Sequence, residues 1–450
     1  MSLEEQRGHR RSSLGAMSAG LSIGTTTSVD LVSAALERAR DASDIFVTLI
    51  PEALADAEAA DLRRANGKPL SPIDGVPTAV KDVIETRGIR TTMASNVYED
   101  YVPENDAAIV AKLRSAGAVV IGKTNATEFS YGICGDVGAF GVVRNPHDAR
   151  LLAGGSSSGS AASVAAGIVP YSIGSDTAGS VRVPAALCGV VGMKPTLGAF
   201  DTAGVYPLAP SFDTLGLLAT CVDDVEMVLD AVGLEVAQSV ETQPCSFQSL
   251  DDVAGNVLDD TVRSTYVKCC AAVDAKPTRL AEALGTDVDF ASLYNTIRAR
   301  EAYQVHASAV SRNPELYQPA TLQKLLAGQE VDEAQYLKAR AEVDQVRAIA
   351  EMAFAESDVL LTPAVPIQAP HACSPAVSAL LSSTSVIWNV LGWPSVTVPI
   401  WLEGVKLPQA IQLSVRPGGD RLLLRAAGHL AACQPLAPDT TFNVGDAASR

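Results

Sequence analysis

Short apolar runs alternate with helical or glycine- and serine-rich stretches between residues 70 and 235. The runs GVPTAVKDV, GAVVIGKT and GIVPYSIGSD have the length and the β-branched content of strands. Similar runs return in residues 356–432, where they read DVLLTPAVP, PSVTVPIWL and QAIQLSV. Such alternation favours an α/β sheet that is covered by helices.

Helical patterns fill much of the remaining chain. Ser28 has the features of a helix N-cap, with Asp30 in the first turn and apolar residues at helical spacing behind it. Residues 236–345 contain little glycine and much alanine and charge, so we expect a variable, mostly helical region. The stretch EAQYLKARAEVDQVRAIAEMAFAES predicts a long amphipathic helix, and RLLLRAAGHLAA predicts the last helix.

Both ends of the chain are polar. We expect residues 1–27 to form a loosely ordered N-terminal segment and residues 437–450 to form a frayed C-terminal tail. The sequence contains no internal repeat.

The composition narrows the function classes. The 450 residues are 47% hydrophobic, which is enough for a large core in one large domain or in two or three smaller ones. The net charge of −17 argues against binding to nucleic acid or to anionic membrane. No run of about 18 apolar residues predicts a membrane span.

Cysteine and histidine contents bear on location and on metals. The eight cysteines include no CxxC pair, and the first twenty residues lack the apolar core of a secretory signal. We therefore expect free thiols in a reducing cytoplasm. None of the five histidines lies at ligand spacing from another histidine or cysteine, so a metal site is not expected.

Residues Gly117–Thr124, GAVVIGKT, match the phosphate-loop pattern. That pattern needs a flexible loop whose N–H groups surround phosphate. The middle residues Ala, Val, Val and Ile instead predict a buried strand. A nucleotide-binding protein that uses Lys123 stays an alternative.

Residues Gly155–Gly159, GSSSG, match the nucleophile elbow of α/β-hydrolases, with Ser157 at its apex. The elbow needs a preceding strand and a later histidine and acid. The preceding DARLLAG is not a clear strand, and the later His306, His371 and His429 lie in ordinary contexts. The elbow is therefore disfavoured.

A wider pattern joins residues 154–167, GGSSSGSAASVAAG, to residues 174–198, GSDTAGSVRVPAALCGVVGMKPTLG. The interleaved SAASVAA and VPAALCGVVG predict a buried helix and a packed element, so the glycines lie inside the fold. Buried glycines allow close backbone approach and leave N–H groups exposed to a ligand. The pattern therefore predicts an anion or oxyanion site, and residues 72–92 supply a lysine to it.

These segments together resemble the amidase signature family. The resemblance rests on DGVPTAVKD, AGAVVIGKTNATEFSYG, NPHDARLLAGGSSSGSAASVAAG, GSDTAGSVRVPAALCGVVGMKPT and SFDTLGLLA, in the family's order and spacing. It implies one α/β/α domain over residues 28–436, with a mixed central sheet covered by helices on both faces and no metal or cofactor. Residues 236–345 match weakly.

The resemblance implies a catalytic triad. Its lysine falls on Lys81, its bridging serine on Ser156 after a cis peptide bond, and its nucleophile on Ser180. Spacing alone does not separate Ser156 from Ser157 and Ser158. A lysine base must be neutral, so the pKa of Lys81 has to lie below its usual value of about 10.4.

The resemblance also implies an oxyanion hole of four consecutive backbone N–H groups. These belong to Thr177, Ala178, Gly179 and Ser180, and Ala178 stands where many members have glycine. The flanking Asp176 and Arg182 are expected to order this loop.

The implied activity is hydrolysis of a small or medium carboxamide to an acid and ammonia or an amine. The alternative within the family is an A-type glutaminase subunit of a tRNA-dependent amidotransferase, which needs a partner chain. Residues Ala126–Phe129 depart from the Met-Asp-Glu-Phe often found in those subunits. A homodimer is compatible with the sequence.

Overall fold

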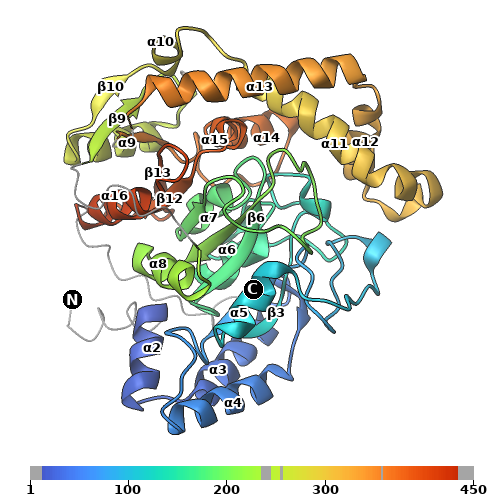
Figure 1. Ribbon diagram of the computed structural model, residues 1–450, viewed down its shortest axis with the longest axis vertical. Helices are drawn as coiled ribbons and strands as arrows, with labels where there is room; N and C mark the ends of the chain where they lie inside the picture. Colours follow the sequence, from blue (N-terminus) through green and yellow to red (C-terminus); the bar gives the residue numbers. More distant parts are fainter. Residues whose placement is uncertain (1–12, 235–244, 254–256, 356–357, 434–450) are drawn as a thin grey trace.

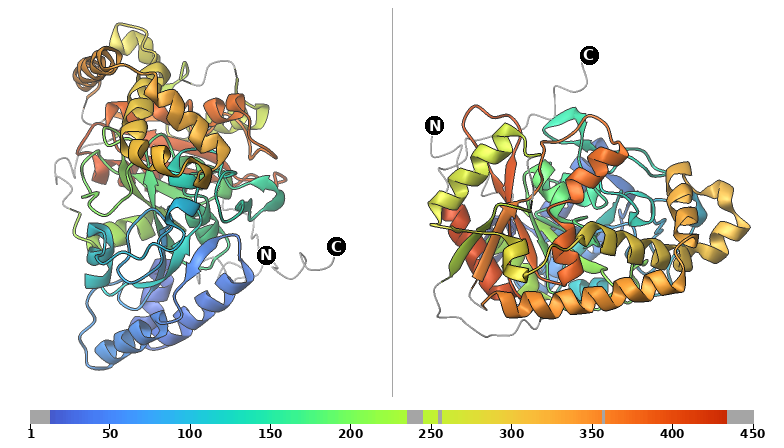
Figure 2. Two further views of the ribbon diagram at one scale, coloured as in Figure 1. Left: turned by 90° about the vertical axis from the view of Figure 1, so that its right-hand side faces the viewer. Right: turned by 90° about the horizontal axis from the view of Figure 1, so that it is seen from above.

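A mixed sheet of eleven strands, flanked by helices, forms the centre of the molecule (Figures 1 and 2). The computed structural model describes residues 13–234, 245–253, 257–355 and 358–433. The strands of the main sheet are β1 Phe46–Leu49, β2 Pro77–Lys81, β3 Val119–Thr124, β6 Tyr171–Asp176, β7 Val191–Lys194, β8 Thr214–Ala219, β9 Ser246–Leu250, β10 Lys276–Thr278, β11 Asp358–Pro363, β12 Ser395–Ile400 and β13 Gln409–Ser414.

The strand order is β1-β3-β2-β6-β8-β7-β12-β13-β11-β9-β10. Strand β2 lies in the N-terminal half of the sheet, parallel to both of its neighbours, β3 and β6. Strands β8, β7, β12 and β13 each pair antiparallel with the next strand in the order. The mixed sheet predicted for the single α/β domain is therefore confirmed.

The helices enclose the sheet. They are α2 Leu14–Ile23, α3 Ser28–Asp41, α4 Ala53–Ala65, α5 Ala108–Ser115, α6 Ser158–Ala165, α7 Arg182–Cys188, α8 Val222–Ala231, α9 Asp260–Ala272, α10 Leu280–Leu284, α11 Phe290–Arg312, α12 Pro319–Gln329, α13 Glu333–Ala353, α14 Pro375–Ser382, α15 Val386–Leu391 and α16 Asp420–Ala432. The helix predicted from the EAQYLKARAEV stretch is α13, and the predicted last helix is α16.

The predicted strands lie where the apolar runs placed them. Strands β2, β3, β6, β11 and β13 are buried at every position, so they sit in the middle of the core. Helices α6 and α7 are also buried along almost their whole length and pack against one another. The glycine-rich segments around them therefore lie inside the fold, as their sequence context predicts.

The N-terminal prediction is corrected by helix α2. The Ser13 side chain accepts a hydrogen bond from the Ala16 N–H group, and Leu14 and Leu21 are buried. The next helix starts with a capping box between Thr27 and Asp30, so the cap lies one residue before the predicted position. Residues 1–12 and the predicted tail 437–450 lie outside the described residues.

Two short strand features were not predicted. Residues 236–345 are mostly helical in their described part, but they also contribute β9 and β10 to the edge of the sheet. The segment DARLLAG contains β5 Asp148–Leu152, which pairs with β4 Arg144–Asn145 in a separate two-stranded sheet. Strand β5 has two exposed residues, so its sequence lacks the apolar run of a core strand.

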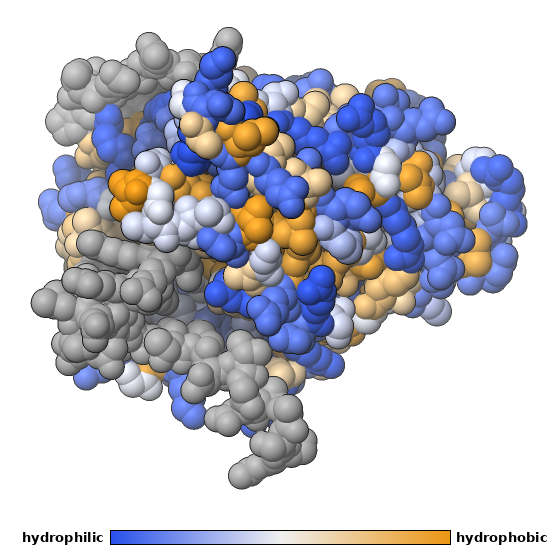
Figure 3. Space-filling view, turned by 90° about the horizontal axis from the view of Figure 1, so that it is seen from below, coloured by the Kyte–Doolittle hydropathy of each residue, from blue (hydrophilic) through white to orange (hydrophobic). Residues whose placement is uncertain are grey.

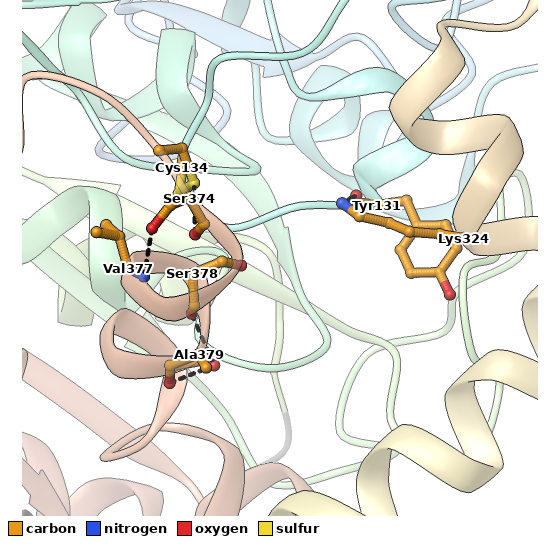
Figure 4. The surroundings of a disulfide bond; sticks show 9 residues. Tyr131, Cys134, Lys324, Ser374, Val377, Ser378 and Ala379 are labelled. Carbon is orange, nitrogen blue, oxygen red and sulfur yellow. Dashed lines mark hydrogen bonds between the residues drawn. A yellow bond between two sulfur atoms is a disulfide. The ribbon is translucent and has the colours of Figure 1, made fainter. Parts of the chain in front are cut away.

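A disulfide bond corrects the expectation of eight free thiols. Cys134 and Cys373 are 239 residues apart in the sequence, and the fold brings their Cα atoms to 6.0 Å (Figure 4). Sequence spacing cannot reveal a pair brought together only by tertiary structure. The bond also removes part of the basis for a cytoplasmic location, because disulfides persist mainly in oxidising compartments.

The surface has a mixed character. On the face shown in Figure 3, hydrophilic residues surround smaller hydrophobic groups. The most exposed large apolar side chains, Ile23, Leu62 and Met352, come from three different helices. No helix among the described residues is long and apolar enough to cross a membrane. Homodimer formation stays a prediction.

We expect peptide mapping under non-reducing conditions to recover a cross-linked peptide that contains Cys134 and Cys373. Cys188 serves as the internal control, because it is buried and free in the structure. Mass spectrometry after alkylation in denaturant reads both results. Alkylation of Cys134 and Cys373 without prior reduction would contradict the disulfide.

Candidate active site

The buried amine of Lys81 is the centre of the site. Lys81 is the last residue of β2, and the parallel pairing of β2 with β6 brings Ser175 close to it. Its Nζ atom lies 2.7 Å from Ser156 Oγ and 2.8 Å from Ser175 Oγ. The structure therefore brings Lys81 and Ser156 together as predicted. Ser175 was missed, although it lies only five residues before Ser180.

Ser156 lies on a loop between β5 and α6. The Gly155–Ser156 peptide bond is cis, as the resemblance implies. The Gly155 N–H group donates to the Ile133 carbonyl at 2.7 Å, and the Thr127 N–H group donates to the Ser156 carbonyl at 3.1 Å. The segment between Thr127 and Ile133 thus binds both residues of this peptide bond and holds Ser156 in place.

The three consecutive serines have different surroundings. Ser157 Oγ donates to the Ser175 carbonyl at 3.1 Å and accepts from the Ser175 N–H group at 3.3 Å. This hydroxyl ties α6 to β6, so it is not the exposed apex of a nucleophile elbow. Ser158 Oγ is buried and has no hydrogen-bond partner among the described residues. Of the three hydroxyls, the one that contacts Lys81 belongs to Ser156.

Ser180 lies on the turn between β6 and α7. Its carbonyl accepts a hydrogen bond from the Ser157 N–H group at 3.1 Å, which joins this turn to the loop that carries Ser156. Gly179 has φ of 109°, and a Cβ atom there would lie 2.6 Å from Ser385 Cβ. Only glycine fits at this position, because the backbone is left-handed and the space is already filled.

Asp176 and Arg182 hold the turn, as predicted. The Asp176 carboxylate accepts from the N–H groups of Gly179 at 2.8 Å and Val181 at 3.1 Å, and it pairs with Arg182 at 2.9 Å. Both side chains are completely buried. A buried carboxylate with this many donors orders the backbone around it.

Two residues from the C-terminal half complete this network. Arg182 donates to Asn389 Oδ1 and, at 2.8 Å, to Gln412 Oε1. Asn389 Nδ2 also donates to the Asp176 carboxylate at 2.9 Å. Both residues are more than 200 positions away in the sequence, so no local pattern could connect them with Asp176.

The Gly179 N–H group is occupied by Asp176, which leaves three of the four predicted oxyanion donors. Within the described residues, the N–H groups of Thr177, Ala178 and Ser180 have no hydrogen-bond acceptor. Free N–H groups on a rigid turn are suited to bind a negatively charged oxygen.

Burial controls the charges in this site. It lowers the pKa of Lys81 to about 7, although the negative charges of Asp176 and Asp213 act in the opposite direction. Burial alone would raise the pKa of Asp176, but the charge and hydrogen bonds of Arg182 hold it well below its usual range. Near neutral pH, the site therefore holds an ionised carboxylate close to an amine that is partly deprotonated.

A small cavity lies beside the site. Ser175 and Thr177 line it on the side of the turn, and Ser130, Tyr206 and Asp213 line it elsewhere. The Thr177 hydroxyl donates to Asp213 at 2.7 Å. The Ser130 hydroxyl is buried and has no hydrogen-bond partner among the described residues, so a polar group entering the cavity could bind it.

Two other candidate sites lack the geometry they need. Lys123 is buried at the end of a strand and donates to the Ile84 carbonyl and to Thr86 Oγ1, so it does not face a phosphate loop. In the described part of the chain, the side chains that lie close enough to share a metal are Cys134, Asp136 and Cys373. The disulfide occupies both sulfur atoms of that group.

A family model described as Amidase matches residues 29–268 and 269–424. The chain belongs to the amidase signature family. This amidase is 34% identical to AtzE of Pseudomonas sp. (strain ADP), which belongs to a 1-carboxybiuret hydrolase, over 84% of this chain and 88% of that one. It is 35% identical to the A-type chain of the glutamyl-tRNA(Gln) amidotransferase of Geobacter metallireducens, over 85% of this chain and 88% of that one.

The fold agrees with this assignment. A crystal structure of an amidase superposes with a TM-score of 0.86 and 30% sequence identity, covering 94% of this chain and 100% of the other. The amidase is therefore an amide-hydrolysing enzyme. Nucleotide binding through the Gly117–Thr124 pattern has no support in either the fold or the relatives.

We expect Asp176→Asn to lower the free energy of unfolding by about 3–5 kcal/mol, because it leaves the buried Arg182 charge uncompensated. Urea denaturation measures the change. The matched control is Glu282→Gln, which removes the exposed ion pair with Arg279 and is expected to cost less than about 1 kcal/mol. Equal losses in the two variants would refute the role given to Asp176.

Proposed function

We propose that the enzyme hydrolyses a small or medium carboxamide through a seryl acyl-enzyme. Ser180 is the nucleophile, Ser156 relays the proton and Lys81 is the base. The observation that carries this proposal is the 2.7 Å contact between Lys81 Nζ and Ser156 Oγ. A serine hydroxyl is a weak nucleophile and needs such a base.

The proton moves in two steps. The neutral Lys81 amine accepts the Ser156 hydroxyl proton, while Ser156 accepts the proton of Ser180. The Ser180 oxygen then attacks the amide carbonyl carbon. The relay runs in reverse to protonate the leaving nitrogen, and water hydrolyses the acyl-enzyme along the same path. The pKa of Lys81 near 7 supports this role, because a base works best when its pKa lies near the working pH.

The tetrahedral intermediate carries a negative oxygen, and the free N–H groups of Thr177, Ala178 and Ser180 bind it. Each such donor contributes about 3–4 kcal/mol in hydrolases where one has been removed. Asp176 and Arg182 hold the turn that carries these groups. The donors therefore need no rearrangement during the reaction.

A second candidate function has support from the relatives. The similarity to the A-type chain of glutamyl-tRNA(Gln) amidotransferase favours a glutaminase of that type. Such a chain would release ammonia from glutamine for a partner chain. Glutamine hydrolysis that appears only after a partner is added would favour this candidate over a stand-alone amidase.

A fluorophosphonate is expected to label the wild-type enzyme and to leave Ser180→Ala unlabelled, because the reagent traps an activated serine. Ser156→Ala should label at least about 100-fold more slowly, since it breaks the path to the base. The control is Ser158→Ala, whose hydroxyl has no partner among the described residues and whose loss should leave the rate unchanged. Undiminished labelling of Ser180→Ala would reject the proposed nucleophile.

The rate of acylation is expected to rise with pH through a midpoint of about 7 and then to level off. The sign follows from the chemistry, because only the deprotonated Lys81 accepts a proton. Pre-steady-state release of product from a chromogenic amide measures this step. Lys81→Met should lack both the activity and the titration, and a rate that is independent of pH from about 5.5 to about 9 would argue against a lysine base.

A further inference from the structure

Two cations that pack against Tyr131 have no carboxylate ion-pair partner among the described residues. Arg298 comes from α11 and Lys324 from α12, and both side chains are half-buried. Neither forms an ion pair with a carboxylate among the described residues. Other arginines nearby differ, since Arg300 pairs with Glu333 and Arg340 pairs with Glu301.

The ring of Tyr131 holds the two cations close together. The Arg298 guanidinium carbon lies 5.0 Å from the centre of the Tyr131 ring and 5.1 Å from that of Tyr294. Lys324 Nζ lies 5.4 Å from the Tyr131 ring centre and donates to the Tyr131 carbonyl at 2.9 Å. Figure 4 shows Lys324 alongside Tyr131. Tyr131 lies on the chain segment that leads to Cys134 of the disulfide.

This pair is costly without a ligand. Burial and the neighbouring Arg298 charge lower the pKa of Lys324, while Asp136 acts in the opposite direction from beyond ion-pair distance. The Nε atom of Arg298 is buried and has no hydrogen-bond partner among the described residues. Cation–π contacts offset only part of the free energy that is needed to bury a charged group. An anion that bound both side chains would satisfy them.

The pair is also connected to the candidate active site through the two tyrosines. Tyr131 lies in the segment that binds the Gly155–Ser156 peptide bond, and its neighbour Ser130 lines the cavity beside Ser175. On the other side, Tyr294 packs against Phe212, whose neighbour Asp213 lines the same cavity. Tyr131 and Tyr294 therefore link the two cations to segments that line this small cavity.

We propose that Arg298 and Lys324 recognise a carboxylate on the substrate, so that the enzyme prefers carboxamides that carry a second, ionised acid group. This inference rests on the proposed function, because it places the amide of the same molecule at Ser180. The planar guanidinium of Arg298 binds both carboxylate oxygens, and the ammonium group of Lys324 adds a point charge.

Matched pairs of amides test this preference. Succinamate and butyramide differ by a carboxylate or a methyl group on the acyl side, and N-acetyl-β-alanine and N-propylacetamide differ in the same way on the amine side. The measured quantity is the ratio of kcat/KM for the charged and the uncharged member of each pair. We expect a ratio above about ten for the wild type in one of the pairs.

Arg298→Gln and Lys324→Gln are each expected to reduce this ratio by about tenfold or more. Arg312→Gln is the control, because Arg312 lies on the same helix but is exposed, and among the described residues it donates only to a backbone carbonyl of its own helix. A wild-type ratio near one, or a ratio that survives in the Arg298→Gln Lys324→Gln double variant, would overturn the inference.

Binding of succinate, measured by calorimetry, separates this inference from the proposed function. Wild-type enzyme should bind succinate at least about tenfold more tightly than Arg298→Gln does, with circular dichroism showing that both are folded. Cleavage of uncharged amides without such a difference would refute the anion site alone. Succinate binding that depends on Arg298, in an enzyme that is not labelled by fluorophosphonate, would refute the proposed function alone.

Discussion

The burial of the Lys81 amine is the constraint on which the site depends. An amine in water is protonated at neutral pH, and a protonated amine cannot accept a proton from serine. Strand β2 is buried at every position, and this burial removes water from the amine and lowers its pKa to about 7. Two serine hydroxyls then replace the lost water as hydrogen-bond partners.

The rest of the architecture serves to bring other groups to this amine. The parallel pairing of β2 with β6 places Ser175 beside it, and the turn after β6 carries Ser180. Buried Asp176 and Arg182 shape that turn, and Asn389 and Gln412 connect it to the C-terminal half of the sheet. Residues from both halves of the chain therefore hold one turn.

The sequence predicted those parts of the structure that depend on residues close together in the chain. Apolar runs located β2, β3 and β6, and the resemblance located Lys81, Ser156 and Ser180. The Cys134–Cys373 disulfide and the contacts of Asn389 with Asp176 were not predictable, because they join residues that only the tertiary fold brings together. Helix α2 was missed because residues 1–27 as a whole are polar and glycine-containing, although the helix itself, LGAMSAGLSI, is mostly apolar and buries Leu14 in the core.

The difference between Gly179 and its neighbours also required the structure. Four consecutive N–H groups look alike in the sequence, yet Asp176 occupies one of them and leaves three free. In the same way, Arg298 and Lys324 are ordinary charged residues on two predicted helices until the fold places both of them around Tyr131.

Direct titration of the Lys81 side chain tests the central claim. Nitrogen-15 NMR of lysine-labelled enzyme can follow its amine, with Lys81→Met assigning the resonance. The account predicts that this resonance titrates with a pKa of about 7, separate from the exposed lysines. A resonance that keeps its proton up to the usual lysine pKa of about 10.4 would contradict it.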